Sequence, residues 1–285
     1  MKEMTAQLAN VAAVHADEPS MPGIVPATLA RIKVELLGFI RNPQSLVFTV
    51  SLPLLLMLIF GSVFSGPVEG TDVDFRQVFI SGIIAAGAMS TAFSGLTISV
   101  VIEREHGIIR RMASSPMPKS AYFIGKVLMV LITTVLEVAL LLLVAVLLFQ
   151  LDLPATAALW GTFIWVLLLG TAACTMAGFA YCALIPNAKS AAAVTTPPFM
   201  ILQFISGVFY PFHMLPGWMQ TIASVFPLAP MTRGFRHVFL PDTFKAVEAG
   251  GVWNLQGIVV TLVAWIILGT FLTAITFKWR GPRVR

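Results

Sequence analysis

The chain has 285 residues, of which 58% are hydrophobic and 11% are charged. A soluble domain carries about 25% charged residues, so this composition excludes an ordinary soluble protein and indicates an integral membrane protein. The formal net charge of +5 does not point to nucleic acid, because the basic residues lie beside apolar segments, where anionic lipid and membrane topology account for them.

The first segment, residues 1–26, is mixed and polar and predicts a flexible cytoplasmic tail. Residues 27–285 are expected to form a single transmembrane domain. At its start, apolar side chains alternate with Arg31, Lys33, Glu35 and Arg41. That pattern is typical of an amphipathic helix lying in the headgroup region of a bilayer. We therefore expect an interfacial helix before the first membrane span.

Six apolar segments are long enough to cross a hydrocarbon core of roughly 30 Å, which takes about 20 residues of helix. They lie at residues 45–65, 78–102, 121–149, 157–184, 191–210 and 255–277. An all-α integral membrane protein with six transmembrane helices is therefore expected. Counted by loop, 14 lysines and arginines fall on one side of these spans and four on the other. The positive-inside rule then predicts a multi-pass protein of the plasma (inner) membrane with both termini cytoplasmic.

Two spans carry small residues at helical spacing. The second span has Gly87, Thr91, Gly95 and Ser99, and the fourth has Gly170, Cys174, Gly178 and Cys182. Such stripes let helix backbones approach closely, since lipid supplies no hydrophobic drive for association. Helix packing is one interpretation, and a substrate path along the stripe is the other. The two cysteines lie about 12 Å apart along a helix, beyond the roughly 7 Å limit for a disulfide.

The loop between the second and third spans concentrates charge. Its candidate docking residues are Glu103, Arg104, Glu105, His106, Gly107, Ile109, Arg110, Arg111, Met112 and Pro116. On a helical wheel this segment is a short amphipathic helix, and its apolar edge of Ile109 and Met112 is expected to be free for a partner. One interpretation is a positive-inside anchor whose charges pair with one another. Such an anchor would need only lysine and arginine, so the two glutamates favour the other interpretation, docking to a soluble partner.

One ionisable residue, Glu137, lies deep inside a predicted span. A charged side chain at that depth costs roughly 2.5–3.5 kcal/mol, so a functional role as part of a substrate path is one hypothesis. The other is a hydrogen-bonded or protonated glutamate between helices, with Thr133 or Thr134 nearby.

The loop between the fifth and sixth spans is too apolar for a solvated loop. Four prolines at positions 211, 216, 227 and 230 break it into pieces too short to cross a membrane. These features predict short external half-helices that dip into the outer leaflet, anchored by Trp218.

A resemblance rests on two motifs. The stretch EREHGIIRRMASSPMPKSAYFIGK resembles the cytoplasmic coupling segment of type-2 ABC exporter membrane subunits, the group that contains daunorubicin-resistance permeases and lipid and polysaccharide exporters. The matching residues are Glu103, Arg104, Glu105, Gly107, Ser115, Pro116, Gly125 and Lys126. Residues 204–240 are similar to the family's late span end, proline-rich external loop and closing arginine. The chain departs from the pattern at Ile108, Arg110 and Gly234.

The resemblance covers about residues 30–277 and implies a membrane subunit of an ATP-driven exporter. The apolar interior suggests a hydrophobic or amphiphilic substrate, such as a drug, lipid or glycolipid, although the family that the chain resembles also moves polysaccharide and ions. The resemblance also implies a separate ATPase subunit that holds ATP and magnesium. Because six spans rarely enclose an alternating path alone, we expect a second permease copy or homologue.

We do not expect this chain to catalyse a reaction by itself. It lacks a G-x-x-x-x-G-K-[ST] motif, so we expect no nucleotide site, and its histidines are too scattered for an H-E-x-x-H metal site. No catalytic residue, cofactor or metal is therefore predicted. The alternative function is an ATP-independent secondary transporter or channel, for which a single buried charge, Glu137, is thin support.

Overall fold

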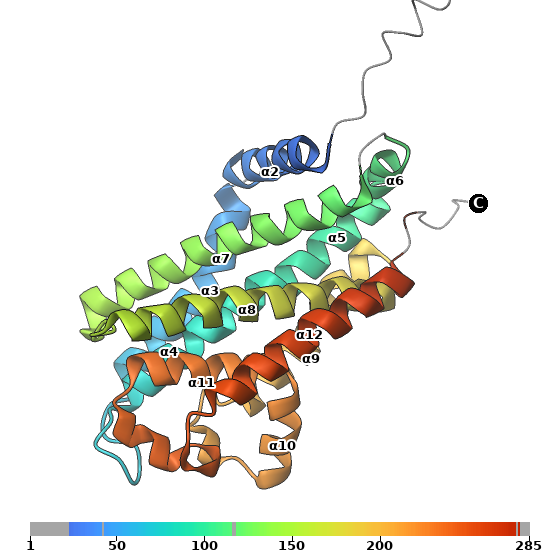
Figure 1. Ribbon diagram of the computed structural model, residues 1–285. Coiled ribbons are helices and arrows are strands. Elements are labelled where there is room, and N and C mark those ends of the chain that lie inside the picture. Colours follow the sequence, from blue (N-terminus) through green and yellow to red (C-terminus); the bar gives the residue numbers. More distant parts are fainter. Residues whose placement is uncertain (1–22, 42, 116–117, 278, 280–285) are drawn as a thin grey trace, which may run out of the picture.

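The computed structural model describes residues 23–41, 43–115, 118–277 and 279 (Figure 1). Within these residues the chain forms helices joined by turns, without a strand. In chain order the helices are α2 (Ile24–Arg41), α3 (Pro43–Val63), α4 (Phe75–Met89), the π-helical η1 (Ser90–Gly95), α5 (Leu96–Glu105), α6 (Ile108–Ala113), α7 (Lys119–Phe149), α8 (Ala157–Tyr181), η2 (Cys182–Leu184), α9 (Ala188–Ile205), η3 (Phe212–Met214), α10 (Gly217–Val225), α11 (Leu228–Phe239), η4 (Asp242–Val247), η5 (Ala249–Gly251) and α12 (Leu255–Thr276).

Among the described residues, four helical segments are long and apolar enough to cross a membrane. They are Phe75–Glu105, Lys119–Phe149, Ala157–Leu184 and Leu255–Thr276. These correspond to the second, third, fourth and sixth predicted spans, so the all-helical membrane architecture is confirmed. The helices α3 and α9 lie where the first and fifth spans are predicted, and α9 contains Pro197 and Pro198. The count of six spans stays a prediction.

The long helices pack side by side, with short helices at the two ends of the bundle. Figure 1 shows α2 beside the first half of α7 and α6 at the same end, whereas α10 and α11 lie at the opposite end. The pairs α8 with α12 and α2 with α7 are in contact. At Gly269 of α12 an added Cβ would lie 2.7 Å from the carbonyl carbon of Met176 on α8. The glycine therefore permits a close approach of two helix backbones.

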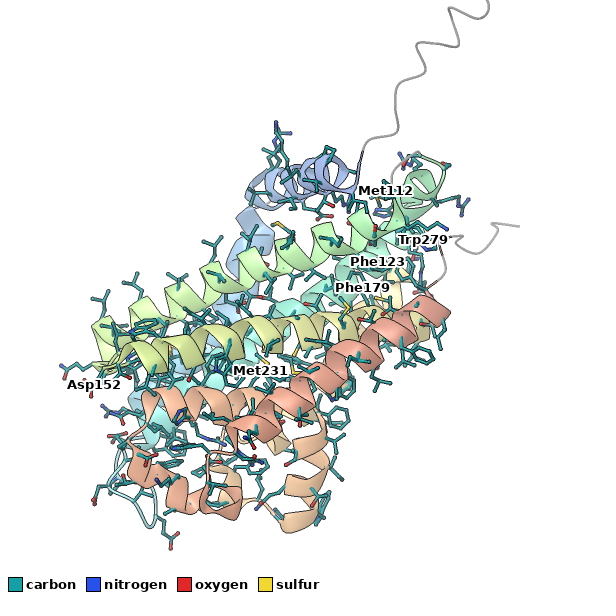
Figure 2. All side chains as sticks on the ribbon, viewed as in Figure 1. Met112, Phe123, Asp152, Phe179, Met231 and Trp279 are labelled. Atoms are coloured by element: carbon teal, nitrogen blue, oxygen red, sulfur yellow. The ribbon has the colours of Figure 1, made fainter. Side chains whose placement is uncertain are left out.

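Aromatic side chains close the bundle near α6. Figure 2 shows Phe123, Phe179 and Trp279 together at this end, and the ring centroids of Phe123 and Phe179 are 5.1 Å apart. Phe123 also contacts Phe277, with the centroids 5.0 Å apart. These contacts fix the start of α7 against α8 and against the residues that follow α12.

The structure contains the helix predicted near the N-terminus and contradicts the prediction for the loop between the second and third predicted spans. The amphipathic helix is present as α2, and residues 1–22 of the predicted tail lie outside the described residues. The charged segment is not one helix, as the wheel assumed, because α5 ends at Glu105 and a new helix, α6, begins at Ile108. Gly107 between them has a φ of +72°, a left-handed conformation that ends a helix and that glycine adopts without strain.

The segment between α9 and α12 consists of the short helices that the prolines predict. Pro211, Pro216 and Pro227 directly precede η3, α10 and α11. Proline fits there because backbone N–H groups at the start of a helix have no acceptor within the helix, so the absence of an N–H group on proline costs no hydrogen bond. Trp218 is 63% exposed, as a membrane anchor would be, although its depth in a bilayer stays a prediction.

A buried ion pair holds the segment between α9 and α12 together. The side chains of Arg236 and Glu248 are each 1% exposed, and the Arg236 Nε lies 2.5 Å from the Glu248 Oε1. Arg236 also donates a hydrogen bond from Nη1 to the Gly207 carbonyl at 3.0 Å. One guanidinium therefore ties α11 to the turn after α9 and to the chain that leads into α12.

We expect Glu248→Ala to lower the free energy of unfolding by about 3–5 kcal/mol, because it leaves a buried guanidinium without its counter-charge. Thermal unfolding of the purified protein in detergent measures the change. The control is Lys245→Ala, which removes an exposed ion pair with Asp242 and should have little effect. Equal destabilisation by the two substitutions would contradict the role of the buried pair.

Candidate functional site

Four charged side chains from three helices meet at the α6 end of the bundle. They are Arg31 and Glu35 of α2, Glu103 of α5 and Lys126 of α7, hereafter the four-charge cluster. The Lys126 Nζ lies 2.7 Å from the Glu103 Oε1 and 3.0 Å from the Glu35 Oε1. The Arg31 Nη2 lies 3.1 Å from the Glu103 Oε1 and also pairs with Glu35. Two positive and two negative charges thus neutralise one another between helices.

The cluster is largely removed from solvent. The exposed fraction of these side chains ranges from 4% for Lys126 to 16% for Glu35. Tyr122 of α7 adds a hydrogen bond, since its hydroxyl donates to the Glu103 Oε2 at 2.9 Å. Breaking such a buried set by removing one member costs far more than breaking an exposed pair.

The local sequence explains how these helices come together. Arg31 and Glu35 are one helical turn apart, the spacing at which side chains on a helix pair. At Gly125 of α7 an added Cβ would lie 2.7 Å from the Arg31 Cγ. Gly125 therefore lets α2 approach α7, and Lys126 beside it supplies the charge. This gives the Gly-Lys pair of the resemblance a physical role.

The next two residues of α5, Arg104 and Glu105, bind it to η2 and α9 on the side opposite α2 and α7. Arg104 donates to the Cys182 carbonyl at 3.0 Å and also to the Ile185 carbonyl. The Glu105 carboxylate accepts a hydrogen bond from the backbone N–H of Ala188, the first residue of α9. A cation at the end of α8 and η2 and an anion at the start of α9 both match the helix dipoles. The three residues Glu103, Arg104 and Glu105 hence bind α5 to helices on both sides.

The apolar edge of α6 is occupied by the protein itself. Ile109 is 1% exposed and lies in the main hydrophobic core, against which Met112 also packs (Figure 2). The exposed side chains of this segment include His106, Arg110 and Arg111. The sequence prediction of a free apolar edge is therefore wrong, and the face left for a partner is basic. Pro116 lies outside the described residues.

A cavity of about 440 Å³ lies beside the four-charge cluster. Its lining comprises Arg31, Val34, Glu35, Gly38, Thr91, Gly95, Leu96, Ser99, Glu103, Ile108, Lys126, Met129, Val130 and Thr133. Three of the four small residues predicted for a path through the second span, Thr91, Gly95 and Ser99, line it. The fourth, Gly87, packs instead against Glu137, whose Oε1 would lie 3.0 Å from an added Cβ.

Glu137 is buried and bonded to the π-helical segment. Its side chain is 2% exposed, and the Thr91 hydroxyl donates to its Oε2 at 2.5 Å. The neighbours predicted from the sequence are not its partners. The Thr133 hydroxyl donates to the carbonyls of Met129 and Val130, and the Thr134 hydroxyl makes no hydrogen bond within the described residues. Short π-helical segments inside α-helices occur often at functional sites, and this one presents Thr91 both to Glu137 and to the cavity.

The small residues of the fourth span pack against other helices. An added Cβ at Gly178 would lie 3.1 Å from the Phe93 carbonyl oxygen, and one at Gly170 would lie 2.5 Å from the Met231 side chain. Cys174 and Cys182 are free and buried, in agreement with the spacing argument. For this stripe the packing interpretation is confirmed.

The sequence did not single out Arg31, Glu35 or Tyr122 as site residues. The one available signal was the Arg31–Glu35 spacing in an otherwise apolar amphipathic helix, which was assigned to headgroup contact. Both residues are nearly buried against α7, because Gly125 leaves room for them.

We expect Glu137→Gln to change the free energy of unfolding by less than about 1 kcal/mol, because glutamine keeps the volume and an acceptor for Thr91. Glu137→Ala should cost about 2–5 kcal/mol, since it opens a cavity and leaves the Thr91 hydroxyl without this acceptor. Thermal unfolding in detergent separates the two. Equal destabilisation by Gln and Ala would show that the structure needs the carboxyl group itself.

Comparison with known proteins places this geometry in a family. A model of the ABC-2 type transporter family matches residues 27–240. The chain is 23% identical over 250 residues to the putative transport permease ycf38 of Porphyra purpurea, which covers 84% of each chain. It is 23% identical over 215 residues to the daunorubicin resistance ABC transporter permease protein DrrB1 of Streptomyces coeruleorubidus, which covers 75% of each.

A third relative is longer than this chain. The probable multidrug ABC transporter permease YbhR of Escherichia coli K12 is 22% identical over 195 residues, covering 67% of this chain and 51% of that protein. The family model alone matches more than half of the chain, and it includes the charged segment, the cavity and Glu137. The chain therefore belongs to the ABC-2 type transporter family, as a membrane permease.

Proposed function

We propose that this chain is the membrane subunit of an ATP-driven exporter and that it forms the translocation path for a hydrophobic or amphiphilic substrate. Family membership supports the transport role. A drug, a lipid or a glycolipid is the substrate class we favour, because one relative is named for daunorubicin resistance and another as a probable multidrug permease.

The observation that carries the proposal is the way α6 is attached. Its inner side is anchored in the core by Ile109, and α5 directly before it is bound to helices on both flanks by Glu103, Arg104 and Glu105. Its outer side presents Arg110 and Arg111. A force applied to this outer face would pass into the bundle with little local deformation. We assign it as the docking point of a separate ATPase subunit, which holds ATP and magnesium.

Topology forms part of the proposal. Helices α3 and α9, of 21 and 18 residues, complete six spans with the four long apolar segments. The charge asymmetry of 14 basic residues to four then puts α6 and both termini in the cytoplasm of a plasma or inner membrane. Because six spans rarely enclose a path alone, a second permease copy or a homologue would complete it.

The competing function is an ATP-independent secondary transporter or channel. Such a protein would couple transport to ions through charges buried near the bilayer midplane. Among the described residues of the long spans, Glu137 is the one carboxylate placed well away from the helix ends, and it is hydrogen-bonded to Thr91. Family membership and the docking surface favour the ATP-driven exporter.

We expect Arg110→Glu to reduce the amount of ATP-binding-cassette subunit that co-purifies with tagged permease from native membranes by about tenfold or more. A reversed charge at an interface costs affinity, and each 1.4 kcal/mol corresponds to about tenfold. Mass spectrometry of the captured complex measures the ratio of the two subunits. Reversal of Glu103 or Glu105 would not test docking, because both carboxylates are bonded within the chain.

The matched control is Lys33→Glu, which makes the same charge change at an exposed position of α2 at the same end of the molecule. It should leave co-purification within about twofold of wild type. If Arg110→Glu behaves like Lys33→Glu at equal membrane levels, α6 is not the docking point. If wild-type permease captures no ATP-binding-cassette subunit, the exporter proposal fails.

A further inference from the structure

The cavity beside the four-charge cluster has properties that the transport role does not require. Its volume of about 440 Å³ lies within the range of roughly 300–1,000 Å³ typical of small-molecule sites. The lining of the cavity changes from charged to uncharged side chains along the helices. On α7 the charged Lys126 is followed one turn deeper by Met129 and Val130, and then by Thr133. The cavity therefore has a charged end near α2 and α6 and an uncharged, partly apolar interior.

The mouth of the cavity lies along α2. Val34 lines the cavity and is nevertheless 61% exposed, and Gly38, one turn further on, is exposed as well. The pattern of α2 is that of a helix in the headgroup region. An amphiphile could therefore place its polar group at the charged end and its apolar part toward the bilayer.

Among charged ligands, the charges at this end favour a zwitterion. An anion that paired with Arg31 and Lys126 would leave Glu35 and Glu103 without counter-charge in a nearly buried site, which is costly. A cation would do the same to the two basic residues. A ligand with both charges can exchange with both halves of the cluster and keep the balance.

The chemical type of each charge follows from the donors and acceptors. Arg31 has a buried Nε that lacks a hydrogen-bond acceptor within the described part of the chain, so its guanidinium can donate one more bond. Guanidinium matches the oxygen atoms of phosphate. The carboxylates call for N–H donors, as in a primary ammonium group. A quaternary ammonium is commonly held by aromatic rings, and none belongs to the described lining of this cavity.

We propose that the cavity binds the headgroup of a membrane phospholipid with a primary amine, such as phosphatidylethanolamine, with its phosphate on Arg31 and Lys126 and its ammonium on Glu35 and Glu103. The binding requires a membrane location for this end of the chain, but no ATPase subunit and no export. It can therefore fail or hold independently of the proposed function.

The test is a titration of the purified full-length permease in detergent, followed by native mass spectrometry. The probes are phosphatidylethanolamine, phosphatidylcholine and phosphatidylglycerol with identical acyl chains, together with soluble phosphoethanolamine. We expect phosphatidylethanolamine to bind at least about tenfold more tightly than each of the others, because carboxylates that accept hydrogen bonds from the N–H groups of a ligand reject analogues that lack those groups. Soluble phosphoethanolamine should bind more weakly because it lacks the apolar part.

A variant that fills the cavity without altering its charges tests the location. Gly95 lines the cavity, and an added Cβ there would lie 3.6 Å from its nearest neighbour, an ordinary contact. We expect Gly95→Leu to weaken phosphatidylethanolamine binding about tenfold or more. The control is Gly161→Leu, on an exposed position of α8 with nothing within 4 Å of the added Cβ, which should leave binding unchanged. Gly38→Leu, at the mouth and equally free of clashes, serves as a second filling variant.

Three outcomes would overturn the proposal. If phosphatidylglycerol binds as tightly as phosphatidylethanolamine, the ligand need not be a zwitterion. If phosphatidylcholine does so, the ligand need not have a primary amine. Soluble phosphoethanolamine that matches the lipid would show that the occupant is not a membrane lipid. Unchanged lipid binding in both filling variants would place any bound lipid elsewhere.

Discussion

Charged side chains near the end of a membrane bundle must be neutralised, and in this chain they are neutralised between helices. Arg31, Glu35, Glu103 and Lys126 belong to three different helices, and each has a counter-charge on another helix. Because a buried charge without a partner is costly, the three helices are held in one arrangement. The cavity beside the cluster and the position of α6 both depend on this arrangement.

The constraint continues on the far side of α5. Arg104 binds carbonyls at the end of η2, and Glu105 binds the first amide of α9, so that α5 connects two halves of the bundle. Small residues let these contacts form, as Gly125 does for α2 and Gly178 does for α8. A partner that moves α6 would therefore act on α2, α7 and α9 together. Such a rigid connection is what an exporter would need between a soluble motor and a membrane path.

Local properties of the sequence were sufficient to predict the long helices. The segments 121–149 and 255–277 appear as Lys119–Phe149 and Leu255–Thr276, because hydropathy is read from neighbouring residues. The prolines of the loop between the fifth and sixth predicted spans likewise predicted its short helices. The break at Gly107 was missed, although glycine after a helical run is a common helix end.

The partners of the charged residues could not be predicted in the same way. A helical wheel shows that a side chain needs a partner, but not whether that partner is another protein or the chain itself. Arg31 and Glu103 are 72 residues apart, and their contact depends on how α2 packs against α7. For the same reason Glu137 was matched with threonines of its own helix, whereas its partner is Thr91 of the preceding span.

The four-charge cluster holds α2, α5 and α7 together, and a double-mutant cycle measures this coupling. The unfolding free energies of wild type, Glu103→Gln, Lys126→Met and the double variant are measured in mixed micelles. The structure predicts a coupling energy above about 1.5 kcal/mol, with the double variant less unstable than the sum of the single changes. A coupling energy below about 0.5 kcal/mol would show that the helices are held by other contacts and would contradict the account.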